Sequence, residues 1–123
     1  MKNYPELRRG MQEQVATLRE ANPKALRAFG QLHHATTQEG ALSQVTKELI
    51  ALGIAVAVRC DACIAAHVHD ALKYGATREQ LAEAIGVAIL MGGGPAAMYG
   101  AEAFHALDQF IAERAIETNG VSA

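Results

Sequence analysis

The stretch ELIALGIAVAVRCDACIAAH, residues 48–67, decides the fold and carries most of the reactive side chains. Its first part, from Leu49 to Val58, is an uninterrupted apolar run between Glu48 and Arg59. A helix that is apolar almost all round belongs in the centre of a fold or in a subunit interface. The second part holds both cysteines and a histidine. We therefore expect a central helix, a short break at residues 60–61, and a second helix packed nearby.

The remaining sequence predicts helices and no strand. Apolar residues recur three or four positions apart, which is the period of an amphipathic helix. Residues that begin or end helices separate these segments: Asn22-Pro23, Ser43, Gly75, the capping box of Thr77 with Gln80, and Gly92-Gly93-Gly94-Pro95. We expect an all-α protein with a single domain over residues 1–123 and about six helices, at residues 4–20, 23 to about 35–39, 44–59, 61–74, 77–92 and 96–117.

Composition excludes some classes of partner. Half of the 123 residues are hydrophobic, aromatic residues make up only 5%, and tryptophan is absent. Small apolar side chains suit closely packed helices and leave apolar faces that favour self-association. The net charge of −2 argues against nucleic acid and anionic membrane surfaces as partners. No apolar stretch reaches the ~20 residues of a membrane span, and the N-terminus does not resemble a signal peptide. We expect a cytoplasmic protein.

The two cysteines, Cys60 and Cys63, are the first candidates for chemistry. In a reducing cytosol such a pair is more often reactive or metal-binding than structural. On a helix that begins at Cys60, the side chains of Cys63, His67, Asp70 and Tyr74 share one face. The positive end of the helix and a histidine one turn below both favour a thiolate. A second thiol three residues away can then resolve an oxidised cysteine as a disulfide.

Glu48 completes this group. A carboxylate among Leu49, Ile50 and Leu52 is costly to bury while ionised, and burial favours proton transfer by such a group. Taken singly, each residue has a structural explanation: His67 as a packed core histidine, Glu48 as a first-turn carboxylate. Their joint occurrence favours a proton relay beside the dithiol.

A zinc site is a separate hypothesis. Cys60, Cys63 and His67 are possible ligands, with His33, His34 or Glu48 as the fourth. Structural zinc sites usually combine two ligand pairs, and only one is evident, so no metal is predicted. Of His33 and His34, which face different ways on a helix, we expect one to be packed and the other exposed.

The spacing Glu48, eleven residues, Cys60-x-x-Cys63, three residues, His67 resembles the signature of the AhpD-like alkylhydroperoxidases of the carboxymuconolactone decarboxylase superfamily. The resemblance implies a compact orthogonal helical bundle, assembly into homo-trimers or homo-hexamers, and a cofactor-free thiol peroxidase acting on hydroperoxides with a thiol or dithiol reductant. It also implies roles: Cys63 attacks the peroxide, Cys60 resolves the oxidised sulfur, and Glu48 and His67 relay protons.

In one position the chain departs from that pattern. The best-studied members have a second histidine directly before the second cysteine, where Ala62 stands. One relay residue is therefore missing, and the order in which the two sulfurs react stays open. Members that resemble the decarboxylase proper generally lack the cysteine pair, which argues against lactone decarboxylation. A general thiol–disulfide exchanger, or a zinc-stabilised or redox-sensing helical module, remains the alternative.

Overall fold

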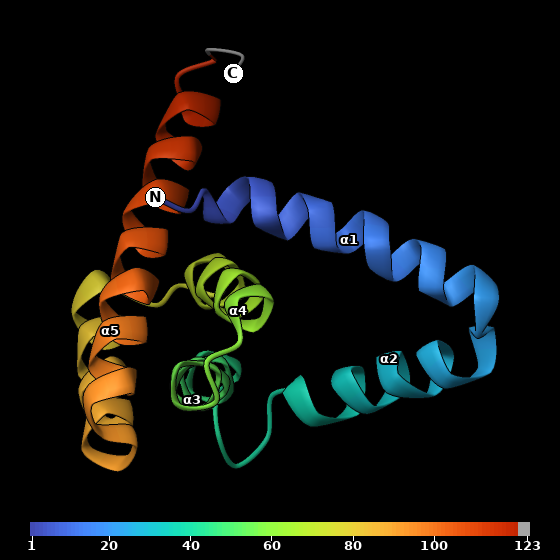
Figure 1. Cartoon of the computed structure of the whole chain (residues 1–123), viewed down its shortest axis with the longest axis horizontal. Coiled ribbons are helices and arrows are strands. Elements are labelled where there is room, and N and C mark those ends of the chain that lie inside the picture. Colours follow the sequence, from blue (N-terminus) through green and yellow to red (C-terminus); the bar gives the residue numbers. More distant parts are fainter. Residues whose placement is uncertain (121–123) are drawn as a thin grey trace.

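A computed structural model describes residues 1–120 of the chain, and every regular element in this range is a helix. The prediction of an all-α protein is confirmed. The elements follow one another as α1 (Tyr4–Ala21), α2 (Pro23–Thr37), α3 (Gln44–Ala57), α4 (Asp61–Lys73) and α5 (Arg78–Thr118) (Figure 1). Their first turns are capped where the sequence predicted, by the side chains of Asn22, Ser43 and Thr77, the last within a capping box with Gln80.

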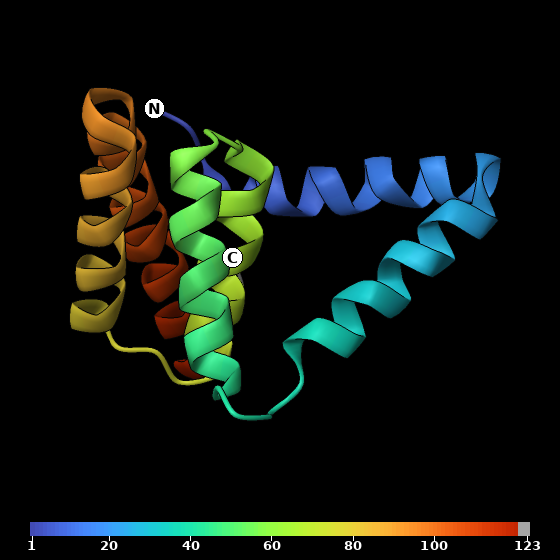
Figure 2. The same cartoon turned by 90° about the horizontal axis from the view of Figure 1, so that it is seen from below.

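The element α5 contains both of the helices predicted for this part of the chain. Gly93 has φ 71° and ψ −150°, outside the helical region, and the chain reverses there (Figure 2). A positive φ costs glycine little, which explains why the reversal falls in the glycine run. We call residues 78–92 the first limb and residues 94–118 the second limb. By length and hydropathy α5 could span a membrane. The reversal leaves a first limb shorter than the ~20 residues that a span needs, and the second limb carries five charged residues, Glu102, Asp108, Glu113, Arg114 and Glu117.

The two limbs of α5 are held together by close packing and by an ion pair. A Cβ atom at Gly100 would lie 2.6 Å from Cγ2 of Ile85, so only glycine permits this approach. At the far end of the limbs, Arg78 donates from Nε to Oδ1 of Asp108 at 3.1 Å. The Arg78 guanidinium also lies over the ring of Phe104, 4.2 Å from its centroid. These contacts fix the antiparallel register of the limbs.

Helices α3 and α4 pack against both limbs and enclose the core (Figures 1 and 2). The fully buried side chains come from all three elements, and include Leu52, Val56, Ile64, Val68, Leu81 and Leu107. Helix α3 ends at Ala57, two residues earlier than predicted. Arg59 adopts φ 59°, and the Cys60 amide then donates to the carbonyl of Ala55 at 3.1 Å. This turn sets the start of α4 beside the end of α3.

Helices α1 and α2 form a hairpin that extends away from the bundle of α3, α4 and α5 (Figure 2). We call residues 4–37 the arm. It is anchored by its first turn: Tyr4 is 1% exposed, and its amide donates to Oε1 of Gln109 at 2.9 Å. Helix α2 has no buried residue, and its apolar Phe29 and Leu32 are 65% and 58% exposed. Tyr4 belongs to the core, and beyond this first turn the arm forms a wall beside the bundle.

Candidate functional site

The two cysteines lie at the N-terminus of α4 and are joined by a disulfide. Cys60 is the N-cap residue, and its Sγ accepts a hydrogen bond from the Cys63 amide at 3.2 Å. Both side chains are half-buried. The positive end of the helix macrodipole thus acts on both sulfurs, which stabilises a thiolate whenever the pair is reduced.

Glu48 and His67 form a buried pair between α3 and α4. Oε2 of Glu48 lies 2.8 Å from Nδ1 of His67, within hydrogen-bond distance. Glu48 is only 1% exposed, whereas the His67 side chain is 21% exposed. The sequence predicted both residues as members of one proton relay, and the structure brings their side chains within hydrogen-bond distance. The carboxylate orients the imidazole and shares a proton with Nδ1, so Nε2 is the nitrogen that can exchange a proton with other groups.

A cavity of about 620 Å³ lies between the arm and α4. The α4 side of the cavity is lined by Cys63 and His67, one helical turn apart, together with Ala62, Ala66 and Asp70. The arm supplies the opposite wall: Arg8, Met11, Gln12, Val15 and Arg19 from α1, and Phe29 and His33 from α2. Of the two cysteines, Cys63 lines this cavity and Cys60 does not.

The cavity also contains the position where the sequence lacks a histidine. Ala62 lines it, and His33 reaches it from α2. The neighbouring His34 does not line the cavity; its Nδ1 lies 3.3 Å from Nε2 of Gln38. The expectation that one of this pair would be packed is wrong, because both are exposed. They nevertheless face different ways, as adjacent residues on a helix must.

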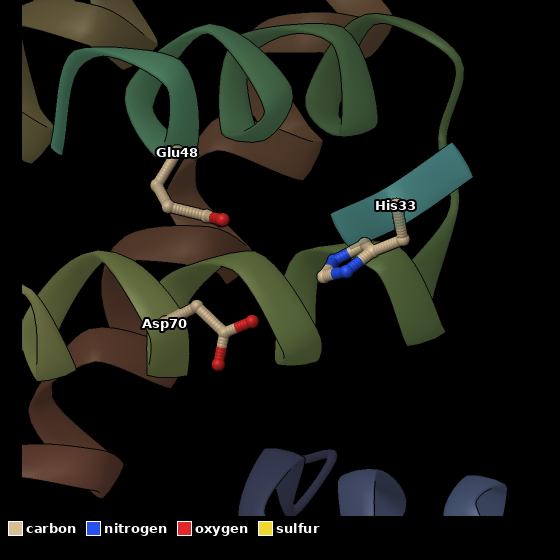
Figure 3. Close-up of side chains that lie close together, drawn as sticks. All are labelled: His33, Glu48 and Asp70. Carbon is tan, nitrogen blue, oxygen red and sulfur yellow. The ribbon is translucent and has the colours of Figure 1, made fainter. Parts of the chain in front are cut away.

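Sequence reasoning missed one group of side chains. One ligand atom each from His33, Glu48 and Asp70 lies within 4.8 Å of the other two (Figure 3). The sequence places Asp70 on the face of Cys63 and His67 without a role, and it gives His33 no chemical role other than that of a possible zinc ligand with the cysteines. An irregular segment separates α2 from α3. Helical periodicity does not extend across such a segment, so the sequence could not predict that His33 lies near Asp70.

The cysteine-based zinc hypothesis is not supported by this arrangement. Cys60 and Cys63 are bonded to each other, and a disulfide offers no thiolate ligand. The His33, Glu48 and Asp70 group contains no cysteine. Another histidine, His69, contacts Asp70: its Nδ1 lies 2.9 Å from Oδ1 of Asp70. The His69 ring also makes a T-shaped contact with the ring of Phe110.

Comparison with known proteins decides the family. Residues 23–106 match the Carboxymuconolactone decarboxylase family. The chain belongs to the carboxymuconolactone decarboxylase family. Among its relatives is an uncharacterized protein of Cupriavidus necator, 46% identical over 95 residues that cover 77% of this chain and 84% of the relative. An uncharacterized protein from the cox locus of Paracoccus denitrificans is 42% identical over 67% of this chain and 74% of its own length.

Solved structures of the carboxymuconolactone decarboxylase family share the fold. An apo family protein from Legionella pneumophila superposes with a TM-score of 0.84 at 42% identity, covering 87% of this chain and 96% of that chain. A family protein from Thermotoga maritima, described with a possible involvement in antioxidative response, superposes with a TM-score of 0.75 at 30% identity, covering 98% and 97%. The family predicted from the Glu48, Cys60, Cys63 and His67 spacing is confirmed.

Proposed function

We propose that this carboxymuconolactone decarboxylase family protein is a thiol-dependent peroxidase that reduces hydroperoxides through Cys60 and Cys63. The observation that carries the proposal is that Cys63 and His67 line one cavity while Cys60 lies within disulfide distance of Cys63. A peroxide in this cavity would meet a sulfur and a proton-transfer group on the same wall. The possible antioxidative involvement of the Thermotoga maritima protein agrees with this chemistry.

The first half of the cycle oxidises Cys63. Nε2 of His67 accepts the proton of the Cys63 thiol, and the thiolate attacks the outer oxygen of the hydroperoxide. The O–O bond breaks as the S–O bond forms, and the electron pair leaves with the alkoxide. The alkoxide takes the proton from His67 and departs as an alcohol. Cys63 is left as a sulfenic acid.

The second half restores the dithiol. The Cys60 sulfur attacks the Cys63 sulfur, the S–O bond breaks, and water leaves as the disulfide forms. This is the state that the structure contains. Two equivalents of an external thiol, or one dithiol, then return two electrons and two protons by thiol–disulfide exchange. Since these steps balance with thiols alone, the cycle needs no cofactor.

The Glu48 and His67 pair supports both proton transfers. The buried carboxylate holds the imidazole through Nδ1 at 2.8 Å, which fixes Nε2 as the working nitrogen. A charge that develops on the imidazole is compensated by the same carboxylate. We therefore assign Cys63 and Cys60 as the reacting sulfurs and His67 as the proton carrier, with Glu48 as its positioning residue. The setting we propose is the cytoplasm, where thiol reductants are abundant.

The test is peroxide consumption by purified protein with a dithiol reductant. Wild type should turn over, and Cys63→Ser should be inactive. Cys60→Ser, reduced beforehand and then assayed without reductant, should consume one equivalent of peroxide per chain, because no second thiol is present to resolve its sulfenic acid. Mass spectrometry of peroxide-treated protein, with the reductant removed, should show the disulfide in wild type and a sulfenic acid in Cys60→Ser. Equal peroxide consumption by wild type and Cys63→Ser would exclude the proposal. Reduction of protein disulfides without peroxide consumption would instead favour the thiol–disulfide exchanger.

A further inference from the structure

The geometry points to a binding site for a divalent transition-metal ion of the zinc type, formed by His33, Glu48 and Asp70. No cysteine takes part, so this site differs from the zinc hypothesis suggested by the sequence. Its three ligands come from three helices, α2, α3 and α4 (Figure 3). Metal binding would therefore connect the arm to the bundle beside the dithiol.

The ligand atoms of His33, Glu48 and Asp70 are close enough to one another to coordinate a single metal ion. The three ligand atoms lie within 4.8 Å of one another, and the side chains converge on one space from separate helices (Figure 3). Zinc with bonds near 2.0–2.2 Å holds tetrahedral ligand atoms about 3.4 Å apart. Closing from at most 4.8 Å to that separation moves each of the three atoms by less than about 1 Å, so all three side chains adjust slightly when a metal binds. The fourth position is left to water.

The donor set selects the class of ion. One imidazole and two carboxylates suit zinc and its neighbours in the first transition row, whereas magnesium and calcium prefer oxygen ligands alone. Two carboxylates balance the charge of a divalent ion. Arg8 and Arg19 line the cavity that His33 and Asp70 also line, so attraction of cations by charge alone is weakened there. Binding then depends on the imidazole nitrogen of His33.

Both carboxylates are already oriented by neighbouring imidazoles. Glu48 is held by His67 at 2.8 Å and Asp70 by His69 at 2.9 Å. Hydrogen-bonded partners of this kind fix the direction of ligating carboxylates and raise metal affinity. Glu48 is also 1% exposed, so its carboxylate has little access to bulk water that would compete with a metal ion.

The site shares Glu48 with the proposed proton relay. A metal ion on Glu48 draws the carboxylate's charge away from His67 and occupies the cavity wall next to Cys63. Zinc should then slow the proposed peroxidase reversibly. The binding itself does not rest on the proposed function, and the two are tested separately.

The decisive experiment is calorimetric titration of zinc chloride into oxidised, chelator-treated protein without an affinity tag. In oxidised protein the disulfide removes the thiolates, which would otherwise bind zinc. We expect one zinc ion per chain, and much weaker binding of magnesium. His33→Ala and Asp70→Asn should each lower zinc affinity by on the order of 100-fold, since even hydrogen-bonded partners of ligands contribute about 10- to 100-fold. His34→Ala is the matched control, because His34 faces away, and should bind as wild type does.

The proposal is overturned if oxidised wild type binds no stoichiometric zinc, or if both variants bind as tightly as the His34→Ala control. His33 is exposed, so its replacement leaves the fold intact. X-ray absorption of the zinc-loaded protein should show nitrogen and oxygen ligands without sulfur; sulfur ligation would also overturn it. Peroxide consumption is measured in chelator, without zinc, so a failed peroxidase assay leaves the zinc titration fully informative.

Discussion

Oε2 of Glu48 on α3 lies 2.8 Å from Nδ1 of His67 on α4, and this bond joins the two helices that carry the candidate site. Only 1% of Glu48 is exposed, so a group that normally prefers water is held inside the bundle by one imidazole. Removing either partner would leave the other without its hydrogen bond inside the protein, which would lower the free energy of unfolding. Its presence next to the dithiol favours a chemical role over a structural one.

Glu48→Gln tests that role. Glutamine keeps the size of the side chain and can still hydrogen-bond His67, but it cannot balance a charge on the imidazole. We expect a fold-retaining variant with peroxide consumption slower by on the order of 100-fold, the scale of assisted proton transfer. Glu83→Gln, an exposed acidic position on α5, serves as the control. Identical rates and pH profiles in wild type and Glu48→Gln would remove the carboxylate from the mechanism.

Ala62→His tests the departure from the family pattern. Ala62 lines the cavity beside Cys63, so a histidine there would add a second proton-transfer group next to the attacking sulfur. We expect faster peroxide consumption, by about 10-fold or more, because a positioned acid–base group typically contributes about 10²–10⁴-fold when it acts fully. The measurement is the initial rate at saturating reductant. A rate no higher than wild type would mean that proton transfer does not limit the reaction.

Tyr4 predicts a specific alkaline behaviour. Burial first, then the negative charges of Glu102 and Asp61, raises the pKa of Tyr4 from 10.0 to about 12. In the unfolded chain the phenol ionises at its ordinary pKa, so the folded state holds the proton more tightly. Its contribution to stability is complete below pH 10 and is lost as the pH rises to about 12.

Denaturant unfolding of wild type and Tyr4→Phe over this pH range checks the expectation. The Tyr4→Phe variant should lose less stability between pH 10 and 12 than wild type does, and ultraviolet titration of tyrosinate should lack a component near pH 12. Parallel loss of stability in both proteins would contradict the assignment.

Replacing two glycines of α5 by alanine should change the free energy of unfolding in opposite directions. At Gly100 the new Cβ would lie 2.6 Å from Cγ2 of Ile85, so Gly100→Ala should destabilise the fold by about 1–3 kcal/mol through overpacking. At Gly86 nothing lies within 4 Å, and Gly86→Ala should stabilise the helix by about 0.5–1 kcal/mol. Urea unfolding measures both. Equal shifts of the same sign would show that the limbs do not pack as described.

The apolar groove between α3 and the first limb of α5 predicts self-association. It has a volume of about 370 Å³ and is lined almost wholly by apolar residues, among which Ile54 and Val87 are 58% and 63% exposed. Contiguous exposed patches of this kind usually mark interfaces. We expect light scattering to give a trimer or hexamer for wild type and a smaller species for Ile54→Lys. A monomeric wild type would contradict the prediction.

Much of the fold follows from local sequence signals. Asn22, Ser43 and Thr77 cap helices because their side chains accept hydrogen bonds from the amides three residues ahead, an effect contained within one turn. The reversal at Gly93 is local too, since it needs only a residue that tolerates positive φ. That a buried Glu48 needs a partner was predictable from its apolar neighbours, whereas its contact with His67 in particular depends on how α3 packs on α4.

The arrangement of the arm could not be predicted in the same way. Helix α2 is amphipathic, and its spacing suggests a face that packs, yet none of its residues is buried. Which wall of the bundle it faces depends on the connection over residues 38–43, which has no periodicity. The positions of His33 and Asp70 relative to Glu48 follow from this tertiary arrangement and not from any motif.

The arm gives the cavity two walls of unequal rigidity. The α4 wall, with the half-buried Cys63 and His67, lies on a helix whose Ile64, Ala65 and Val68 are in the core, whereas α2 has no buried residue. Segments with few buried apolar contacts open at low free-energy cost, and well-packed helices do not. In the proposed peroxidase, α2 could then move to admit a larger hydroperoxide while Cys63 and His67 keep their spacing, so substrate size and reaction geometry would be controlled by different helices.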